Sequence, residues 1–316
     1  MSDILFIKTS SLGDVIHHMP AVTDARRHRP QAKIGWVVEE AFAPLVRLNC
    51  AVDTVIPVAS RRWRTAPFSA ETWREVSAFA RAMRAQTHEI VIDAQGLLRS
   101  ALIARFARGC RHGYDRASVR ERPASWLYDV HHDVDRALHA ITRNRMLTGQ
   151  VLGYTPDGTL DFGLDRGRLM NGEPSRGVVL LHATARPEKE WPAANWIELA
   201  QDLAAGGYKV VLPWGNAAER ARSDEIAAAV PNAKVPDLQP LDDAARMIAR
   251  AAFVVGVDTG LLHLAAALGV PLAAIFVGTE PGQHGPLGAG KIEIAGGLGQ
   301  MPSVSDVRAA VARIAP

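Results

Sequence analysis

The sequence has few cysteines, no long apolar run and no large excess of one charge. Its 316 residues include only two cysteines, Cys50 and Cys110, which lie outside any C-x-x-C pattern, so a disulfide scaffold and a zinc cluster are excluded. No run approaches the ~18 uncharged apolar residues that a membrane-spanning helix needs. The first eight residues lack the long apolar segment of a secretory signal. We therefore expect a cytoplasmic protein.

Several ligand motifs are also missing or incomplete. No Gly-x-Gly-x-x-Gly follows an expected strand, which weakens a nicotinamide dehydrogenase interpretation. Residues 285–291 have P-loop spacing, but Ile292 stands where Ser or Thr must hold magnesium, so we expect a loop leading into an extended segment. Asp133 and Asp135 form an Asp-x-Asp with no apolar strand before it, and no His-Glu-x-x-His is present. We expect neither a metal ion nor a cofactor.

The composition is that of an ordinary globular protein, with an uneven distribution of charge. The chain is 48% hydrophobic and 22% charged, and 316 residues suffice for two domains of roughly 150 residues each. Residues 1–158 carry 22 Lys and Arg against 16 Asp and Glu, whereas residues 159–316 carry 14 against 17. The first half is therefore expected to meet an anion, which leaves nucleic acid, an acidic membrane surface and a phosphorylated small molecule open.

Short β-rich runs alternate with helical patterns along the whole chain, which is typical of βαβ units and parallel sheets. We expect strands at residues 4–8, 33–38, 54–58, 89–93, 178–182, 209–213, 253–258 and 272–277. The predicted class is α/β, with two doubly wound domains. The predicted boundaries are residues 1–160 for the first domain, 161–176 for a linker rich in Gly, Asp and Pro, 177–302 for the second domain and 303–316 for a closing helix.

The first expected strand ends in a polar loop that runs from Lys8 to Asp14. Ligands of open parallel sheets bind at such strand exits. A helix beginning near Asp14 would direct free N–H groups into the loop, which favours an anion. Asp14 has two interpretations at this point. It is a helix N-cap contributing about 1 kcal/mol, or it is a carboxylate with no adjacent Arg that accepts a proton from an incoming hydroxyl.

Three successive strand exits in the second half carry polar groups that suit a nucleoside diphosphate. The groups are Thr184, Lys189, Glu219, Asp258, Thr259 and Gly260. A hydroxyl, a cation and a helix start can hold phosphate oxygens, and a carboxylate can accept hydrogen bonds from ribose. Capping alone also accounts for Asp258 and Thr259, and His263 can be an ordinary core histidine. One ligand, however, explains all three exits together.

A basic cluster follows the expected strand at residues 54–58. Arg61, Arg62 and Arg64 surround Trp63, and Arg120 stands in another polar loop. These cations could clamp phosphates of an acceptor while Trp63 covers an apolar part of it, or they could form a solvated face. Sequence-specific nucleic-acid binding is disfavoured because no helix-turn-helix, zinc finger or aromatic platform accompanies the charge.

The chain resembles the lipopolysaccharide heptosyltransferases of glycosyltransferase family 9. The resemblance extends from end to end and is carried by Lys8–Val15, Trp36–Glu40, Arg61–Arg64, Val91–Leu97, Leu181–Thr184, Leu212–Gly215 and Val257–Leu261. It implies a GT-B fold, in which two Rossmann-like domains face each other across a cleft. It also implies inverting transfer of L-glycero-D-manno-heptose from ADP-heptose to the first 3-deoxy-octulosonate (Kdo) of Kdo2-lipid A, without a metal. The alternative is type II transfer to a core that already carries heptose.

The resemblance also implies roles for particular residues. The first domain would bind the acceptor and the second the donor, with Asp14 as the general base. The implied donor-binding residues are Thr184, Ala185, Lys189, Glu219, Gln239, Asp258, Thr259, Gly260 and His263. The expected acceptor-binding residues are Lys8, Ser10, Arg61, Arg62, Arg64 and Arg120. Ala185 departs from the family pattern, which has a second Thr there. The implied partners are ADP-heptose, Kdo2-lipid A and the cytoplasmic face of the inner membrane, where the protein would be peripheral.

Overall fold

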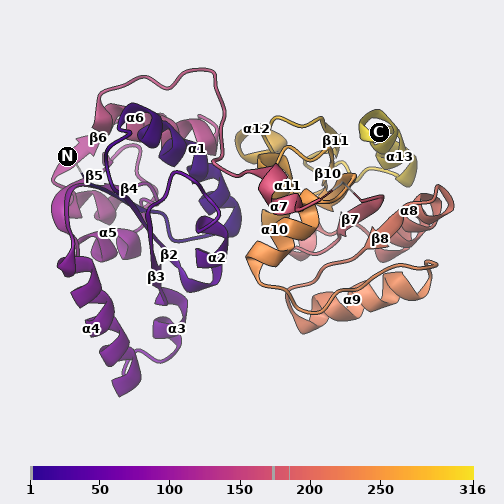
Figure 1. Ribbon diagram of the computed structural model, residues 1–316, viewed down its shortest axis with the longest axis horizontal. Helices are drawn as coiled ribbons and strands as arrows, with labels where there is room; N and C mark the ends of the chain where they lie inside the picture. The colour runs from indigo at the N-terminus through magenta and orange to yellow at the C-terminus, as the bar shows by residue number, and fades with distance from the viewer. Residues whose placement is uncertain (1–2, 173–174, 185) are drawn as a thin grey trace. The chain divides into compact units, whose positions relative to one another are not determined.

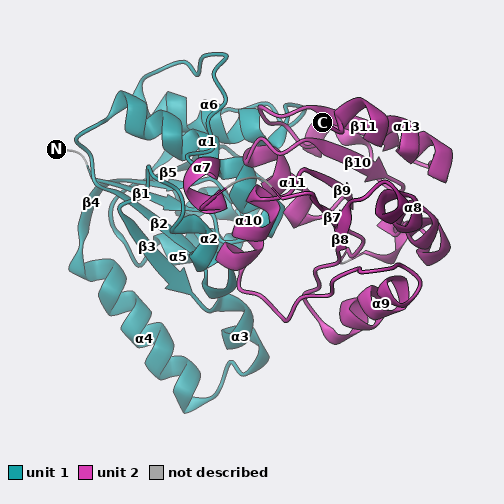
Figure 2. Cartoon of the chain, turned by 45° about the vertical axis from the view of Figure 1, so that its right-hand side comes forward, with its two compact units in different colours: residues 1–163 teal, residues 164–316 magenta. Residues whose placement is uncertain are grey.

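The computed structural model describes residues 3–172, 175–184 and 186–316, and it divides the chain into two compact units. Unit 1 spans residues 1–163 and unit 2 spans residues 164–316 (Figure 2). Each unit is a parallel β-sheet with α-helices packed against it, as the alternating pattern predicts.

The sheet of unit 1 has six parallel strands in the order β3-β2-β1-β4-β5-β6 (Figure 1). Its strands are β1 (Ile4–Ile7), β2 (Ile34–Glu39), β3 (Thr54–Val58), β4 (Thr87–Asp93), β5 (Arg108–Tyr114) and β6 (Val130–His132). The four strands expected from the sequence are confirmed. Strands β5 and β6 were not expected, because they lie toward one edge of the sheet, are partly exposed and carry mostly polar residues.

The helices of unit 1 include short 3-10 segments, labelled η. They are α1 (Leu12–His28), η1 (Glu40–Phe42), α2 (Ala43–Val46), α3 (Ser60–Thr65), α4 (Ala70–Ala85), α5 (Leu98–Ala104), η2 (Arg122–Leu127) and α6 (Ala140–Leu152). Helices α4 and α5 pack on one face of the sheet, since Phe79 and Met83 share a core cluster with Ile103 and with Leu5 of β1. Helix α1 packs against α6 through the buried ion pair of Asp24 with Arg145 and other contacts.

The sheet of unit 2 has five parallel strands in the order β11-β10-β9-β7-β8. They are β7 (Gly177–Leu181), β8 (Lys209–Val211), β9 (Phe253–Val257), β10 (Leu272–Phe276) and β11 (Ile292–Gly296). The four expected strands and the extended segment after residue 291 are confirmed. Strands β7, β9 and β10 are buried along their whole length, as strands covered on both faces must be.

Along the sequence of unit 2, helices precede, separate and follow the strands. They are α7 (Arg166–Met170), η3 (Pro187–Lys189), α8 (Ala193–Ala205), α9 (Ala217–Ala228), α10 (Leu241–Ala249), α11 (Gly260–Ala267), α12 (Pro281–His284) and α13 (Val304–Ile314). The closing helix is confirmed, and Ser303 caps it by accepting a hydrogen bond from the backbone N–H of Asp306. Among the described residues, no helix is both long enough and apolar enough to cross a membrane.

Candidate active site

The loop after β1 of unit 1 leads into α1, with Ser11 as the N-cap and Asp14 in the first turn. The Asp14 Oδ2 atom accepts hydrogen bonds from the backbone N–H of Ser11 at 2.9 Å and from its hydroxyl at 3.3 Å. Asp14 is therefore not the N-cap, which corrects one of its two interpretations. Its other oxygen, Oδ1, has no hydrogen-bond partner within the described part of the chain. The side chain is 27% exposed, so a ligand hydroxyl can reach it.

A guanidinium group lies near Asp14, contrary to the expectation that no Arg is adjacent. The Arg120 Nη1 atom lies 3.9 Å from Asp14 Oδ2, and Arg120 comes from the segment between β5 and η2. Its side chain is 60% exposed, so solvent screens the pair strongly. Arg120 therefore remains available to a second anion.

The loop between β1 and α1, which leads to Asp14, is held by hydrogen bonds with the residues that follow β4. The Gln95 Oε1 atom accepts the backbone N–H groups of Thr9 at 3.1 Å and Ser10 at 3.2 Å. The Lys8 ammonium donates to the Ala94 carbonyl at 2.8 Å. Sequence reasoning assigned no role to Gln95, although it lies inside a segment that carries the family resemblance.

Two buried ionisable groups complete this support. Burial lowers the pKa of Lys8, although the nearby carboxylates of Asp14 and Asp93 oppose the shift. Burial raises the pKa of Asp93, although it accepts hydrogen bonds from the hydroxyls of Ser100 at 2.7 Å and Tyr128 at 2.8 Å. Lys8 is therefore an enclosed side chain that ties the loop after β1 to the Ala94 carbonyl.

Three of the four arginines expected at the acceptor lie on α3 and differ in their surroundings. Arg62 is paired, with Glu40 at 3.1 Å and Glu75 at 2.5 Å. The Arg61 guanidinium lies over the Phe42 ring at 5.2 Å. Arg64 is exposed and makes no ion pair with any described residue. The structure therefore leaves Arg61 and Arg64 free of carboxylates, whereas Arg62 is neutralised.

The Trp63 side chain packs within unit 1. Its indole N–H donates to Glu75 at 2.7 Å, and its ring contacts Phe79 edge-on at 5.7 Å.

In the loop between β1 and α1, the Ser10 hydroxyl lies 3.5 Å from an Arg99 nitrogen. Sequence reasoning did not select Arg99. Its place in the first turn of α5, after the β4 strand exit, is the signal that could have found it.

In unit 2, the Asp258 carboxylate joins loops that follow three different strands. It contacts Lys189 Nζ at 2.5 Å, the Thr279 hydroxyl at 2.8 Å and His263 Nε2 at 3.7 Å. The Thr184 hydroxyl donates to the Asp258 carbonyl at 3.3 Å. Burial on its own would raise the pKa of Asp258, but the hydrogen bonds from His263, Lys189 and Thr279 hold it well below its usual range. Asp258 is therefore a carboxylate surrounded by donors.

Thr279 is the one member of this network that sequence reasoning missed. It lies just beyond the end of β10, in the fourth strand exit of the unit. Searching every strand exit, instead of three of them, would have found it. Ala185, which was expected at the same site, lies outside the described residues.

The remaining donor-site candidates lie at helix starts and on the surface. Thr259 is the N-cap of α11 and Gly260 its first residue, and the Thr259 side chain makes no capping hydrogen bond in the described structure. Glu219 accepts hydrogen bonds from the Gly215 backbone N–H at 2.7 Å and from the Asn216 side chain at 2.7 Å. A carboxylate has further lone pairs, so Glu219 can also accept from a ligand. Gln239 is exposed in the loop before α10.

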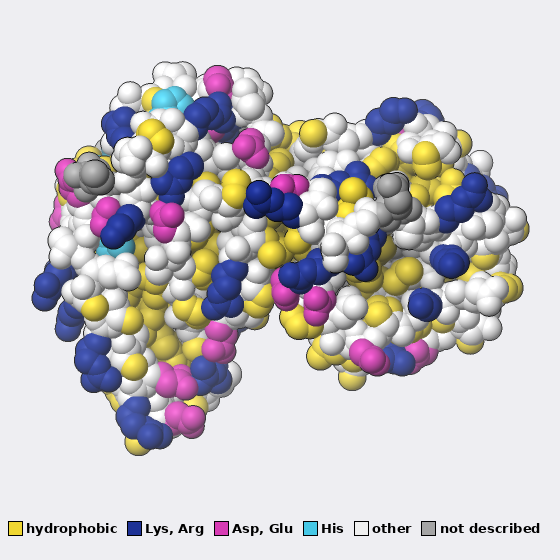
Figure 3. All heavy atoms as spheres, viewed as in Figure 1, with side chains coloured by type: hydrophobic (Ala, Val, Ile, Leu, Met, Phe, Trp, Pro, Cys, Tyr) yellow, Lys and Arg dark blue, Asp and Glu magenta, His cyan; other side chains and the backbone are white. Residues whose placement is uncertain are grey.

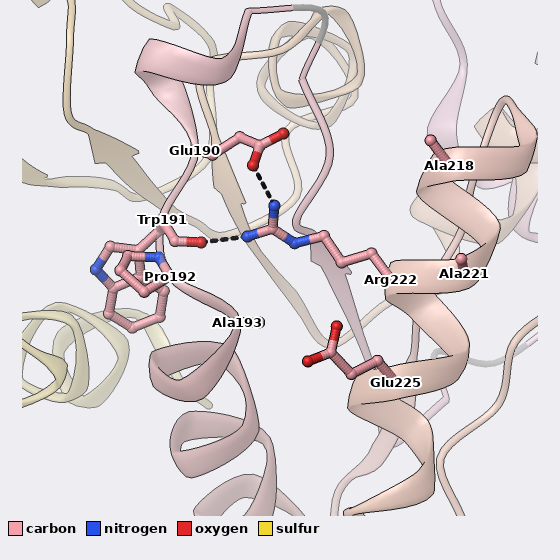
Figure 4. A pocket seen from close by; sticks show the side chains of 8 residues that line it. All are labelled: Glu190, Trp191, Pro192, Ala193, Ala218, Ala221, Arg222 and Glu225. Carbon is pink, nitrogen blue, oxygen red and sulfur yellow. Dashed lines mark hydrogen bonds and ion pairs between the residues drawn. The ribbon is translucent and has the colours of Figure 1, made fainter.

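A pocket of about 530 Å³ lies between the loop that carries Lys189 and helix α9 (Figure 4). Arg222 reaches from α9 across this pocket, and it pairs with the Glu190 carboxylate and donates to the Trp191 carbonyl. The carboxylate of Glu225, one turn further along α9, also points into the pocket. Arg222 thus holds the two residues directly after Lys189.

The arrangement in unit 2 suits a diphosphate. The Lys189 ammonium, the Thr184 hydroxyl and the free N–H groups at the start of α11 are donors near one point of the sheet edge, where negative charge is stabilised. Among the described residues, no group of three or more His, Cys, Asp or Glu side chains is placed to hold a metal ion.

Together, the two parallel α/β units and their strand-exit sites define a glycosyltransferase of the GT-B type. The chain belongs to glycosyltransferase family 9 (heptosyltransferase), whose family model matches residues 76–310. It is 43% identical over 289 residues to lipopolysaccharide heptosyltransferase 1 of Escherichia coli (strain K12), covering 90% of this chain and 91% of that protein.

Solved structures agree with this assignment. The structure of E. coli heptosyltransferase WaaC with ADP has a TM-score of 0.93 and 39% identity, covering 99% of this chain and 100% of that chain. WaaC has also been solved with ADP-2-deoxy-2-fluoro heptose, at a TM-score of 0.89, 38% identity and coverage of 98% of this chain and 99% of that one. Lipopolysaccharide heptosyltransferase 2 of E. coli (strain K12) is 36% identical over 107 residues, which cover 32% of this chain and 30% of that protein.

We expect Lys189→Ala to weaken ADP binding by about 10- to 100-fold, because it removes a charge-assisted hydrogen bond and leaves the Asp258 carboxylate to repel the diphosphate. Isothermal titration calorimetry measures the effect. Lys291→Ala is the matched control, since Lys291 is an exposed lysine of the same unit. Equal ADP affinity in the two variants would show that the diphosphate binds elsewhere.

We expect His182 to make the stability of the protein depend on pH. Burial, aided by the Arg222 charge, lowers the pKa of His182 from 6.5 to about 4, and its Nε2 atom lies 2.8 Å from the Ser223 hydroxyl. The unfolded chain therefore binds this proton first as pH falls. The contribution of neutral His182 to the free energy of unfolding is fully present above about pH 6.5. It is lost as pH falls toward 4, which lowers the free energy of unfolding by about 3 kcal/mol.

Urea unfolding of His182→Gln between pH 4 and 7 measures this contribution, because Gln can keep a hydrogen bond to Ser223 but does not titrate. Its free energy of unfolding should fall less with acid than that of the wild type. Parallel curves for the wild type and His182→Gln would contradict the assignment.

Proposed function

We propose that the protein transfers L-glycero-D-manno-heptose from ADP-heptose to the first Kdo of Kdo2-lipid A, with inversion at the anomeric carbon. The 43% identity to lipopolysaccharide heptosyltransferase 1 supports the substrate assignment. The observation that carries the chemistry is the Asp14 carboxylate, which Ser11 holds through Oδ2 while Oδ1 remains without a partner among the described residues.

The donor binds unit 2 in this proposal. Lys189, Thr184 and the α11 start at Thr259 and Gly260 hold the diphosphate, and they stabilise the negative charge that develops as ADP departs. The assignment draws support from the Asp258 network, which fixes the Lys189 ammonium before any ligand arrives. Further assigned residues are Asp258 and His263 at the donor sugar, Glu219 at the ribose, Gln239 at the adenine and Ala185 at the diphosphate.

The acceptor binds unit 1. Asp14 removes the proton from the attacking Kdo hydroxyl as that oxygen forms its bond to the anomeric carbon. The carboxylate and phosphates of the acceptor bind cationic side chains. Arg61 and Arg64 make no ion pair with any described residue, and Arg120 lies 3.9 Å from the Asp14 carboxylate, so all three are available. Lys8, Ser10 and Arg62 are assigned to the same site. Lys8 contributes from its enclosed position, and Arg62 must exchange partners to contribute.

Type II transfer, to a core that already carries heptose, is the alternative acceptor. The type I assignment is favoured because the identity to heptosyltransferase 1 covers 90% of the chain, whereas the identity to heptosyltransferase 2 covers 32%.

A lipid-linked acceptor requires the protein to work at a membrane surface. We therefore propose a peripheral location at the cytoplasmic face of the inner membrane.

We expect Asp14→Asn to lower kcat by about a thousandfold, because general bases typically contribute 10²- to 10⁴-fold. The Asn oxygen can still accept from Ser11, so ADP affinity should stay within a few-fold and the fold should persist. Turnover is read as product mass after incubation with ADP-heptose and either Kdo2-lipid A or a heptosylated core. Only Kdo2-lipid A should gain one heptose.

Asp133→Asn is the matched control for this variant. Asp133 is an exposed carboxylate of the same unit, so its replacement should leave turnover within about twofold. Unchanged turnover of Asp14→Asn would remove the base assignment. A product formed only from the heptosylated core would replace the type I acceptor by the type II acceptor.

A further inference from the structure

Helices α3 and α4 form a hairpin that exposes two large aromatic side chains. Phe68, in the connection between the helices, is 94% exposed, and Trp73, in the first turn of α4, is 61% exposed. Neither belongs to the site described above. Aromatic side chains of this size are usually buried, so their exposure on one short segment indicates an interaction surface.

The outer face of α4 combines this aromatic character with positive charge. At 3.6 residues per turn, Trp73, Arg74, Arg81 and Arg84 fall within an arc of about 100°. All four are exposed, whereas Phe79 and Met83 are buried on the other side of the helix. A shallow hollow on the same face is lined by Trp73, Arg74 and Arg81, among other α4 residues. We define the hairpin surface as Phe68, Trp73, Arg74, Arg81 and Arg84.

The arginines of the hairpin surface have two acidic neighbours on α4, Glu71 and Glu75, but are not paired with them. Within the described residues, Arg74, Arg81 and Arg84 make no ion pair, although Arg62 on the neighbouring helix is paired twice. The exposed arginines on the helices of unit 2 provide a contrast. Arg246 pairs with Asp242, and Arg308 pairs with Glu198.

The space-filling view shows the same combination. Lys and Arg side chains follow the edge of unit 1 where α4 runs, and hydrophobic side chains lie between α4 and α3 together with some Asp and Glu side chains (Figure 3). Glu71 and Glu75 also line the hollow, but Glu75 is paired with Arg62, so the three arginines keep this face positive. Positive charge beside exposed apolar groups complements a surface that is anionic outside and apolar beneath.

We propose that the hairpin surface docks on an anionic lipid bilayer, with Phe68 and Trp73 inserted at the interface and the three α4 arginines on lipid phosphates. This inference rests on the proposed function, which requires a lipid-linked acceptor. Trp is enriched at membrane interfaces, and each basic residue near an anionic leaflet strengthens binding. Phe68 and Trp73 add apolar area that a purely electrostatic partner would not need.

Flotation with vesicles of phosphatidylglycerol and phosphatidylethanolamine, containing no Kdo2-lipid A, tests the proposal. The wild type should float with these vesicles but not with pure phosphatidylcholine, and binding should weaken with salt. The triple variant R74Q/R81Q/R84Q should have a partition coefficient at least about tenfold lower. The variant F68S/W73S should also bind more weakly, because it loses the inserted apolar groups.

Matched controls separate this surface from overall charge and hydrophobicity. R246Q/R308Q/R313Q removes the same number of charges from paired arginines of unit 2, and it should bind as the wild type does. L298S/M301S removes two exposed apolar side chains from unit 2 and should also have no effect. Equal binding of R74Q/R81Q/R84Q and R246Q/R308Q/R313Q would overturn the proposal, as would a wild type that binds duplex RNA but not the vesicles.

A second assay keeps this inference separate from the proposed function. Turnover with ADP-heptose and a water-soluble, deacylated Kdo acceptor should be the same for the wild type and R74Q/R81Q/R84Q, which also shows that the variant is folded. Loss of turnover by the variant on this acceptor would place the arginines in the catalytic site and overturn a docking role. Absence of turnover in the wild type on both acceptors would contradict the proposed function and would leave the flotation result unaffected.

Discussion

The ion pair between Asp258 and Lys189 is the interaction on which the donor site depends. The Lys189 loop follows β7, Asp258 follows β9 and Thr279 follows β10, so one carboxylate connects three strand exits. Such a connection is possible because parallel strands deliver their carboxyl ends to one edge of a sheet. The cost of burying Asp258 is offset by its donors, which are thereby fixed in place. A preorganised set of donors is what a departing diphosphate requires.

The two units place their principal carboxylates in opposite environments. Asp258 is surrounded by donors that keep its pKa low, so it organises its neighbours and does not take up a proton. Asp14 is held through one oxygen, and its other oxygen is free of partners among the described residues. Only the second arrangement leaves a site for a proton from a ligand hydroxyl. In our proposal, the same fold element, a carboxylate after a buried strand, therefore serves binding in one unit and catalysis in the other.

Much of the fold could be predicted from the sequence, because buried parallel strands such as β7 and β9 are continuous apolar runs. Strands β5 and β6 could not, since they lie toward one edge of the sheet, carry mostly polar residues and owe their conformation to their neighbours. At the site, residue type and strand-exit position selected Asp14, Lys189 and Asp258. The same reasoning selected Arg120 but did not place it beside Asp14, and it missed Gln95 at the loop after β1, because contacts between loops far apart in the sequence depend on strand order.

We propose above all that ADP binds at the Asp258 network of unit 2. A crystal structure of the protein with ADP tests it most directly. We predict a diphosphate within hydrogen-bond distance of Lys189 Nζ and of the backbone N–H groups at the start of α11. Diphosphate density at the loop after β1, or anywhere remote from Lys189, would contradict the claim.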